Sequence, residues 1–116
     1  MKKETKTTRK KFEKLRIIGN NYKITYHKVI VDERNGHSLD GQINESTQEI
    51  KIKKGLNYEY ELKVIIHEAL HGIDFEICFN LSNEEDRNTQ FTTGISCFIR
   101  DNQEFVTEYM RILNGG

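Results

Sequence analysis

The spacing of apolar residues changes once along this chain, at Asn57. Before that residue, apolar and polar side chains alternate in short runs, as in residues 22–26 and 49–53. After it, apolar residues recur every three or four positions. A period of two is typical of a half-buried strand, whereas a period of 3.6 is typical of an amphipathic helix. The chain is therefore expected to fold as an α+β protein, with a small sheet first and helices after it.

Two hairpins are expected in the first half. Residues 15–18 and 22–26 flank a turn at residues 19–21, and residues 42–44 and 49–53 flank a polar turn. Only one face of these runs is apolar, so one face of the sheet should meet a core and the other should meet water. We expect three or four strands in an antiparallel or mixed sheet. The strand with Ile50 and Ile52 is the one expected to offer an edge to an extended peptide.

Three helices are expected in the second half. Asn57 is a plausible N-cap for the first, which carries apolar residues at helical spacing up to Ile77. Ser82 and Glu85 have the spacing of a capping box and would begin the second helix. Asp101 interrupts that helix, and a short third amphipathic helix follows before the terminal glycines.

Length and charge limit the remaining possibilities. A chain of 116 residues fits one domain, which we expect over residues 14–114. Residues 1–13 are expected to form a flexible basic tail, because up to Arg16 the chain has eight Lys or Arg against two Glu. No apolar run is long enough for a membrane span or a secretory signal, so a cytoplasmic location is expected. Cys78 and Cys97 are expected to be reduced, partly buried thiols.

The first helix contains the motif His67-Glu68-Ala69-Leu70-His71. Two histidines four residues apart lie on one helix face, so both imidazoles can reach one zinc ion. Glu68 follows the first histidine and can reach a metal-bound water, where a hydrolase needs a general base. Zn²⁺ is therefore the expected cofactor, with His67 and His71 as ligands and Glu68 as the catalytic residue.

A catalytic zinc usually has a third protein ligand. Glu84 and Glu85 open the second helix, and either one is a candidate. Projection of that helix favours Glu84 but leaves Glu85 possible, because a helix start is uncertain by a residue or two. Asp74 lies one turn beyond His71 and is expected to accept a hydrogen bond from a ligating histidine. His27 and His37 lie in polar segments and are expected to be exposed and not to bind metal.

The helix from Ile65 to Asp74 resembles the active-site helix of small phage-encoded zinc metallopeptidases related to the ImmA/IrrE group. Other features shared with that family are spread over residues 15–105: Ile17-Ile18-Gly19 with Tyr22, Gly41, Ile50-Lys51-Ile52, Glu84-Glu85 and Arg100-Asp101-Asn102. One position departs from it, since Asn88 stands where the family usually has an apolar residue.

The resemblance implies a minimal gluzincin-like fold, with the sheet packed on the His67–His71 helix and two further helices. It implies zinc-dependent peptide hydrolysis of a protein or peptide substrate in a bacterial host cell. It also implies that His67 and His71 bind zinc, that Glu68 is the base, and that one acid of the Glu84-Glu85 pair is the third ligand.

Two other functions are considered. The first is a non-catalytic zinc protein that keeps the motif and acts as a regulator or binds a host factor. The second is a nucleic-acid-associated protein that uses its basic tail. Because no recognition-helix or aromatic–basic pattern accompanies the tail, nucleic acid is not the expected partner, and neither is a membrane. The substrate and the oligomeric state do not follow from the sequence.

Overall fold

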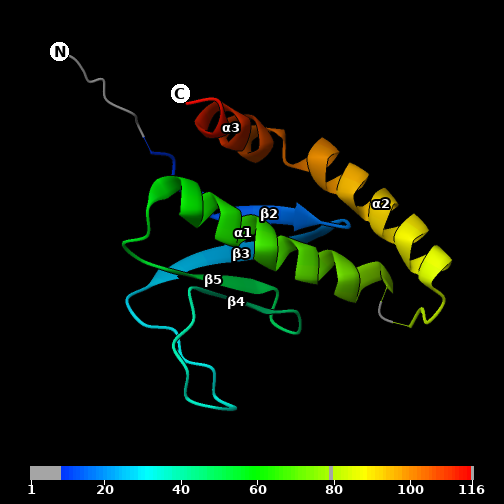
Figure 1. Cartoon of the computed structure of the whole chain (residues 1–116), viewed down its shortest axis with the longest axis horizontal. Coiled ribbons are helices and arrows are strands. Elements are labelled where there is room, and N and C mark those ends of the chain that lie inside the picture. The colour runs from blue at the N-terminus through cyan, green and yellow to red at the C-terminus, as the bar shows by residue number, and fades with distance from the viewer. Residues whose placement is uncertain (1–8, 79, 116) are drawn as a thin grey trace.

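The computed structural model describes residues 9–78 and 80–115. Figure 1 shows a twisted sheet with α1 lying across one face and α2 and α3 continuing beyond it. The elements in chain order are β2 (Lys14–Ile17), β3 (Asn20–His27), β4 (Gly41–Asn44), β5 (Glu49–Lys53), α1 (Tyr58–Ile73), a π-helical segment η1 (Asp74–Cys78), α2 (Glu84–Asp101) and α3 (Gln103–Leu113). The expected α+β fold, with a four-stranded mixed sheet and three helices, is confirmed.

The first hairpin forms as expected, but its turn begins earlier. Strands β2 and β3 pair antiparallel with Lys14 opposite Lys23. The two turn residues are Ile18 and Gly19, with φ of 48° and 79°. A two-residue hairpin loop that matches the twist of its strands requires positive φ at both positions. The turn signal at residues 19–21 therefore lay one residue too late, because Asn20 already belongs to β3.

The second hairpin, β4 with β5, also forms as expected. The strand order is β2-β3-β5-β4, and β5 pairs parallel with β3 and antiparallel with β4. The expectation that β5 offers a free edge for a peptide was therefore wrong, because both of its edges are occupied. The free edge on this side of the sheet belongs to β4.

Helix α1 packs its apolar face on the sheet. Leu62 and Ile65 are fully buried, as are Ile50 and Ile52 beneath them. Burying such a side chain contributes about 1.5–3 kcal/mol relative to leaving it exposed. Asn57 caps the helix as expected, since its side chain accepts from the Tyr60 N–H. The packing fixes the rotation of α1 and so decides which residues of the helix face solvent.

Helix α2 begins one residue later than the capping-box signal indicated. Its N-cap is Asn83, whose side chain accepts from the Asp86 N–H at 3.0 Å. Asp86, and not Glu85, therefore occupies the third position of the helix. Helices α1 and α2 approach closely, since a Cβ built on Gly94 would clash with Ile73 Cγ2. Only glycine fits there without displacement of a neighbour.

The segment expected to be a basic tail contacts the domain over its described part, residues 9–13. Arg9 pairs with buried Glu61 at 3.1 Å, and the Lys10 N–H donates to the Tyr58 hydroxyl at 2.8 Å. Phe12 is buried in an edge-to-face contact with Phe105. The packed unit thus includes residues 9–13, and the rest of the tail prediction lies outside the described residues. Among the described helices, none has the length and apolar character needed to cross a membrane.

Candidate metal centre

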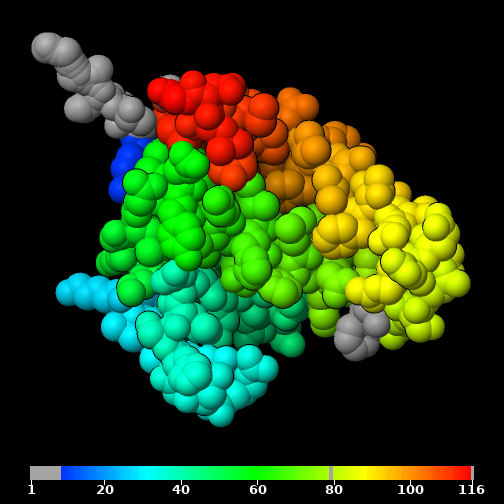
Figure 2. All heavy atoms as spheres, viewed as in Figure 1, coloured from blue at the N-terminus to red at the C-terminus, as the bar shows by residue number. Residues whose placement is uncertain are grey.

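His67 and His71 lie on the side of α1 that the sheet does not cover. Both residues are exposed. Their ring centroids are 4.9 Å apart, and the ring planes are inclined at 82°. The apolar side chains of α1 face the sheet, so the two histidines lie on the solvent-exposed side of the helix. Figure 2 shows the outer surface of α1 uncovered between the β4–β5 hairpin and the start of α2.

Glu68 lies between them in the sequence and is buried where α1 meets β4. It is only 7% exposed. Strand β4 passes so close that a Cβ built on Gly41 would lie 3.2 Å from Glu68 Oε2 and 2.6 Å from Val64 Cγ1. Burial raises the pKa of the Glu68 carboxyl, while the two histidines oppose that shift and Glu45 adds to it. Gly41 is thus the residue that lets the edge strand reach this carboxylate.

No described residue donates a hydrogen bond or an ion pair to the Glu68 carboxylate. Buried polar groups in folded proteins almost always have a partner, since an unsatisfied one costs about 1–3 kcal/mol and a charged one more. A carboxylate that is buried, unpartnered and next to two exposed histidines fits a site in which a further group supplies the missing donor. A water held by a metal on those histidines is such a group.

The structure does not gather the complete set of expected ligands. Among the described residues, no three His, Cys, Asp or Glu side chains lie close enough together to hold a metal ion. Glu84 and Glu85 are both exposed in the first turn of α2, where neither carboxylate forms a hydrogen bond or ion pair with a described residue. Because the cap is Asn83, the capping role considered for Glu85 is absent. Both carboxylates are therefore free to turn.

Asp74 contacts an arginine rather than a histidine. Its Oδ1 accepts from Arg87 Nη2 at 2.7 Å, and Arg87 Nη1 donates to the carbonyl oxygens of Cys78 and Leu81 at 3.0 Å. Arg87 thus fastens the first turn of α2 to the segment that follows His71. This role of Arg87 could not be predicted from local patterns, because the carbonyl acceptors belong to a loop whose path only the fold decides.

A second connection, from the sheet to η1, was also missed. The Tyr22 hydroxyl donates to Glu76 Oε2 at 2.7 Å, and burial together with Glu76 raises the pKa of Tyr22. Glu76 lies in the π-helical segment, whose wider turn changes the direction in which side chains after Ile73 point. Tyr22 and Arg87 together hold this segment on two sides.

The remaining candidate residues lie elsewhere. His27 Nε2 is 2.8 Å from the Thr25 hydroxyl, on the sheet face opposite α1. His37 is exposed, in the loop between β3 and β4. Cys78 and Cys97 are free, the first buried and the second half-buried.

Comparisons with known proteins add no relative. No family model, no curated protein and no solved structure matches this chain.

Proposed function

We propose that this protein is a zinc-dependent peptidase. The observation that carries the proposal is Glu68, a buried carboxylate without a described partner, placed between the edge strand β4 and two exposed histidines with adjacent rings. A purely structural glutamate would be expected to have a donor, as Glu61 has in Arg9. Glu68 instead lies where a general base for a metal-activated water is needed.

His67 and His71 would hold the ion, each through one ring nitrogen. When bound, zinc lowers the pKa of its water to about 7 and polarises a carbonyl oxygen. Glu68 would accept the proton of the attacking water and deliver it to the leaving amine. The close passage of β4 over Glu68 would limit the carboxylate to orientations that face the histidine flank.

For the third ligand we favour Glu84 over Glu85. Glu84 precedes Arg87 by three residues and therefore lies on nearly the same side of α2, whereas Glu85 projects well away from it. Arg87 is fastened to Asp74, which follows His71 by three residues. A side chain on the Arg87 side of the first turn is thus directed toward the end of α1 that carries His71.

The substrate would bind as an extended chain along β4. This strand forms the outer edge of the sheet and lies directly beside Glu68. An edge strand offers unpaired backbone groups, so a peptide can bind there through main-chain hydrogen bonds. Residues 41–44 would then place a peptide bond of the substrate near the histidine flank.

The test combines metal content with cleavage of a peptide library. The purified protein should bind about one zinc per chain, measured by plasma mass spectrometry after dialysis. The His67→Ala variant should lose that zinc. The His37→Ala variant, which replaces an exposed histidine outside the site, should retain it. Glu68→Gln should keep the zinc and the fold but lose cleavage by a factor of about 10² to 10⁴. Absence of zinc from the wild-type protein would contradict the proposal.

A second function has one observation in its favour. The described residues bring only two metal-binding side chains together, which suits a protein that keeps a zinc site for recognition of a partner. Glu68→Gln separates the two functions. A peptidase loses its effect with this substitution, whereas a zinc-dependent binder retains its partner.

A further inference from the structure

The sheet face opposite α1 is strongly cationic. Alternate residues of β2, β3 and β5 project from it, because successive side chains of a strand point to opposite faces. The basic residues on this face are Lys14, Arg16, Lys23, Lys51 and Lys53. Glu49 is the one acidic residue of the described strands that projects from it, and its Oε2 already accepts from the Thr25 hydroxyl at 2.7 Å.

These five cations differ from most of the arginines of the described chain. None of them forms an ion pair with a described residue, whereas Arg34, Arg87, Arg100 and Arg111 each pair with an acid. Lys14 even lies directly opposite Lys23 across the β2–β3 ladder. Like charges at opposed positions destabilise a sheet. The fold therefore carries a concentration of positive charge that it does not neutralise itself.

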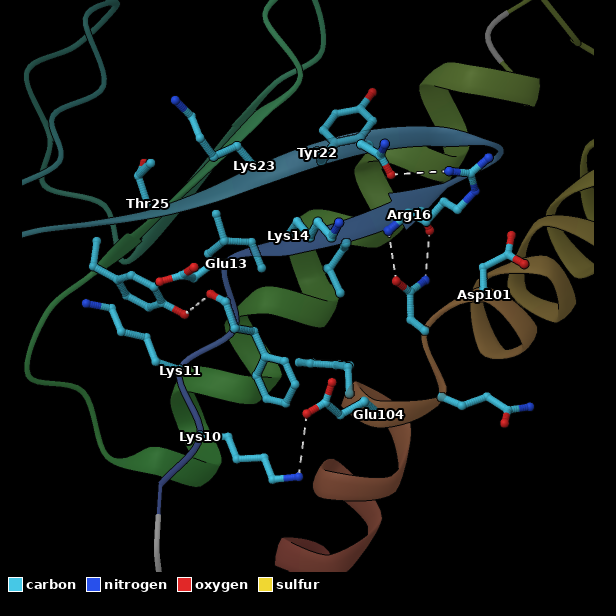
Figure 3. A pocket seen from close by; sticks show the side chains of 18 of the residues that line it. Lys10, Lys11, Glu13, Lys14, Arg16, Tyr22, Lys23, Thr25, Asp101 and Glu104 are labelled. Atoms are coloured by element: carbon cyan, nitrogen blue, oxygen red, sulfur yellow. Dashed lines mark hydrogen bonds and ion pairs between the residues drawn. The ribbon is translucent and has the colours of Figure 1, made fainter.

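A groove along β2 extends this cationic surface. Figure 3 shows Lys14, Arg16 and Lys23 on the two neighbouring strands, with Lys10 and Lys11 on the segment that leads into β2. The opposite rim is formed by the junction of α2 and α3, around Asp101 to Phe105. The groove is thus lined by more basic than acidic side chains and is open to a ligand from solvent.

Two observations indicate what kind of ligand fits. The face carries no large apolar or aromatic side chain, because the apolar residues of β2, β3 and β5 all point toward α1. A protein partner normally needs an apolar centre in its interface. The β2 edge is also blocked, since the Asn102 amide donates to the Arg16 carbonyl and accepts from its N–H at 2.7 and 2.8 Å. An added peptide strand could not use those groups.

We propose that this cationic face binds the phosphate backbone of a nucleic acid, without reading its sequence. Phosphates satisfy exposed lysines without apolar contact, and the release of their counterions supplies the free energy. The absence of exposed aromatic side chains on the face argues against stacking of bases there. The face lies on the side of the sheet away from α1, so this binding does not rest on the zinc site or on peptidase activity.

The test is fluorescence anisotropy with labelled 20-base-pair duplexes of two unrelated sequences and a matching single strand, using the full chain. Binding should be equal for the two duplexes and should weaken steeply with salt. If five phosphates are neutralised, the logarithm of affinity should fall with the logarithm of salt concentration with a slope of about −4.5. That slope corresponds to a loss of about 500-fold between 50 and 200 mM salt.

Two double variants with the same change of charge localise the site. Lys14→Gln/Lys23→Gln should reduce the slope by about 1.8 and weaken binding about 60-fold at 0.1 M salt. Lys28→Gln/Lys63→Gln, which removes two exposed lysines outside the face and the groove, should leave the slope unchanged. Equal slopes for the two variants would overturn the proposal.

A further variant distinguishes the face from the basic N-terminal residues. Lys2→Gln/Lys3→Gln/Lys6→Gln should leave the contribution of Lys14 and Lys23 intact. If this triple variant abolished binding while Lys14→Gln/Lys23→Gln retained it, the proposal would be overturned.

Polyglutamate serves as the probe for binding of an acidic protein. Binding of polyglutamate as tight as that of the duplex at equal salt would assign the face to an acidic protein instead.

Discussion

Glu68→Gln should make the metal-free protein more stable. Glu68 is 7% exposed and has no described donor, so its charge is buried without compensation. Leaving such a group unsatisfied costs about 1–3 kcal/mol, and more when it is charged. A neutral amide avoids the charged part of that cost. We therefore expect the free energy of unfolding at pH 8 in EDTA to rise by about 1–3 kcal/mol, which corresponds to roughly 4–12 °C in Tm for a chain of this size.

The pH dependence of this gain follows from the direction of the pKa shift. Burial raises the pKa of Glu68 in the folded protein above its ordinary value of 4.5. Above the folded pKa the carboxyl is ionised in both states, so the wild-type protein carries the full penalty. As the pH falls through the folded pKa, the native carboxyl takes up a proton and the penalty declines. The difference in free energy of unfolding between Glu68→Gln and wild type should therefore be largest at neutral pH. It should decrease as the pH falls and disappear near pH 4.5.

The assay is urea unfolding followed by circular dichroism, with and without added zinc. Glu61 provides the matched control: it lies on the same helix and is also 7% exposed, but it accepts from Arg9 Nη2 at 3.1 Å. Glu61→Gln should give a smaller gain in stability than Glu68→Gln. Burial raises the pKa of Glu61 as well, but Arg9 and Lys11 offset part of that effect. Added zinc should reduce the difference in free energy of unfolding between wild type and Glu68→Gln. A Glu68→Gln protein less stable than wild type in EDTA would refute the reasoning.

Three other predictions concern packing and capping. Gly41→Ala should lower the free energy of unfolding by about 1–3 kcal/mol and reduce cleavage, because the added Cβ would displace Val64 and crowd Glu68; this is measured by urea unfolding and a peptide assay. Gly94→Ala should destabilise by a similar amount without changing zinc content, which would separate a packing effect from a site effect. Asn83→Ala should cost about 1 kcal/mol in thermal unfolding, whereas Ser82→Ala should cost almost nothing.

Each of these three predictions has a result that would contradict it. A Gly94→Ala protein of higher stability would mean that the gain in helix propensity, about 1 kcal/mol, exceeds the cost of the close contact. Equal effects of the two capping substitutions would mean that the first turn of α2 is not held by its cap. An unchanged cleavage rate in a folded Gly41→Ala protein would remove β4 from the neighbourhood of the reaction.

The local pattern of the sequence was sufficient to predict the secondary-structure elements and their types. Alternation predicted both hairpins, and helical spacing after Asn57 predicted the helices, because period and capping are properties of neighbouring residues. The same spacing placed His67 and His71 together on one flank of α1. Where two local signals competed, the choice failed by one residue, as with Ser82 and Asn83 at the start of α2.

The sequence alone could not predict how segments far apart in the chain contact one another. The parallel pairing of β3 with β5 makes β4 the edge strand, and nothing within either strand distinguishes that order from a simple meander. The partner of Asp74 is Arg87, which only the path of residues 78–83 brings near. The burial of Glu68 likewise depends on how closely β4 passes at Gly41. Periodicity fixes which way a side chain points along its own element, but only tertiary packing decides what it meets there.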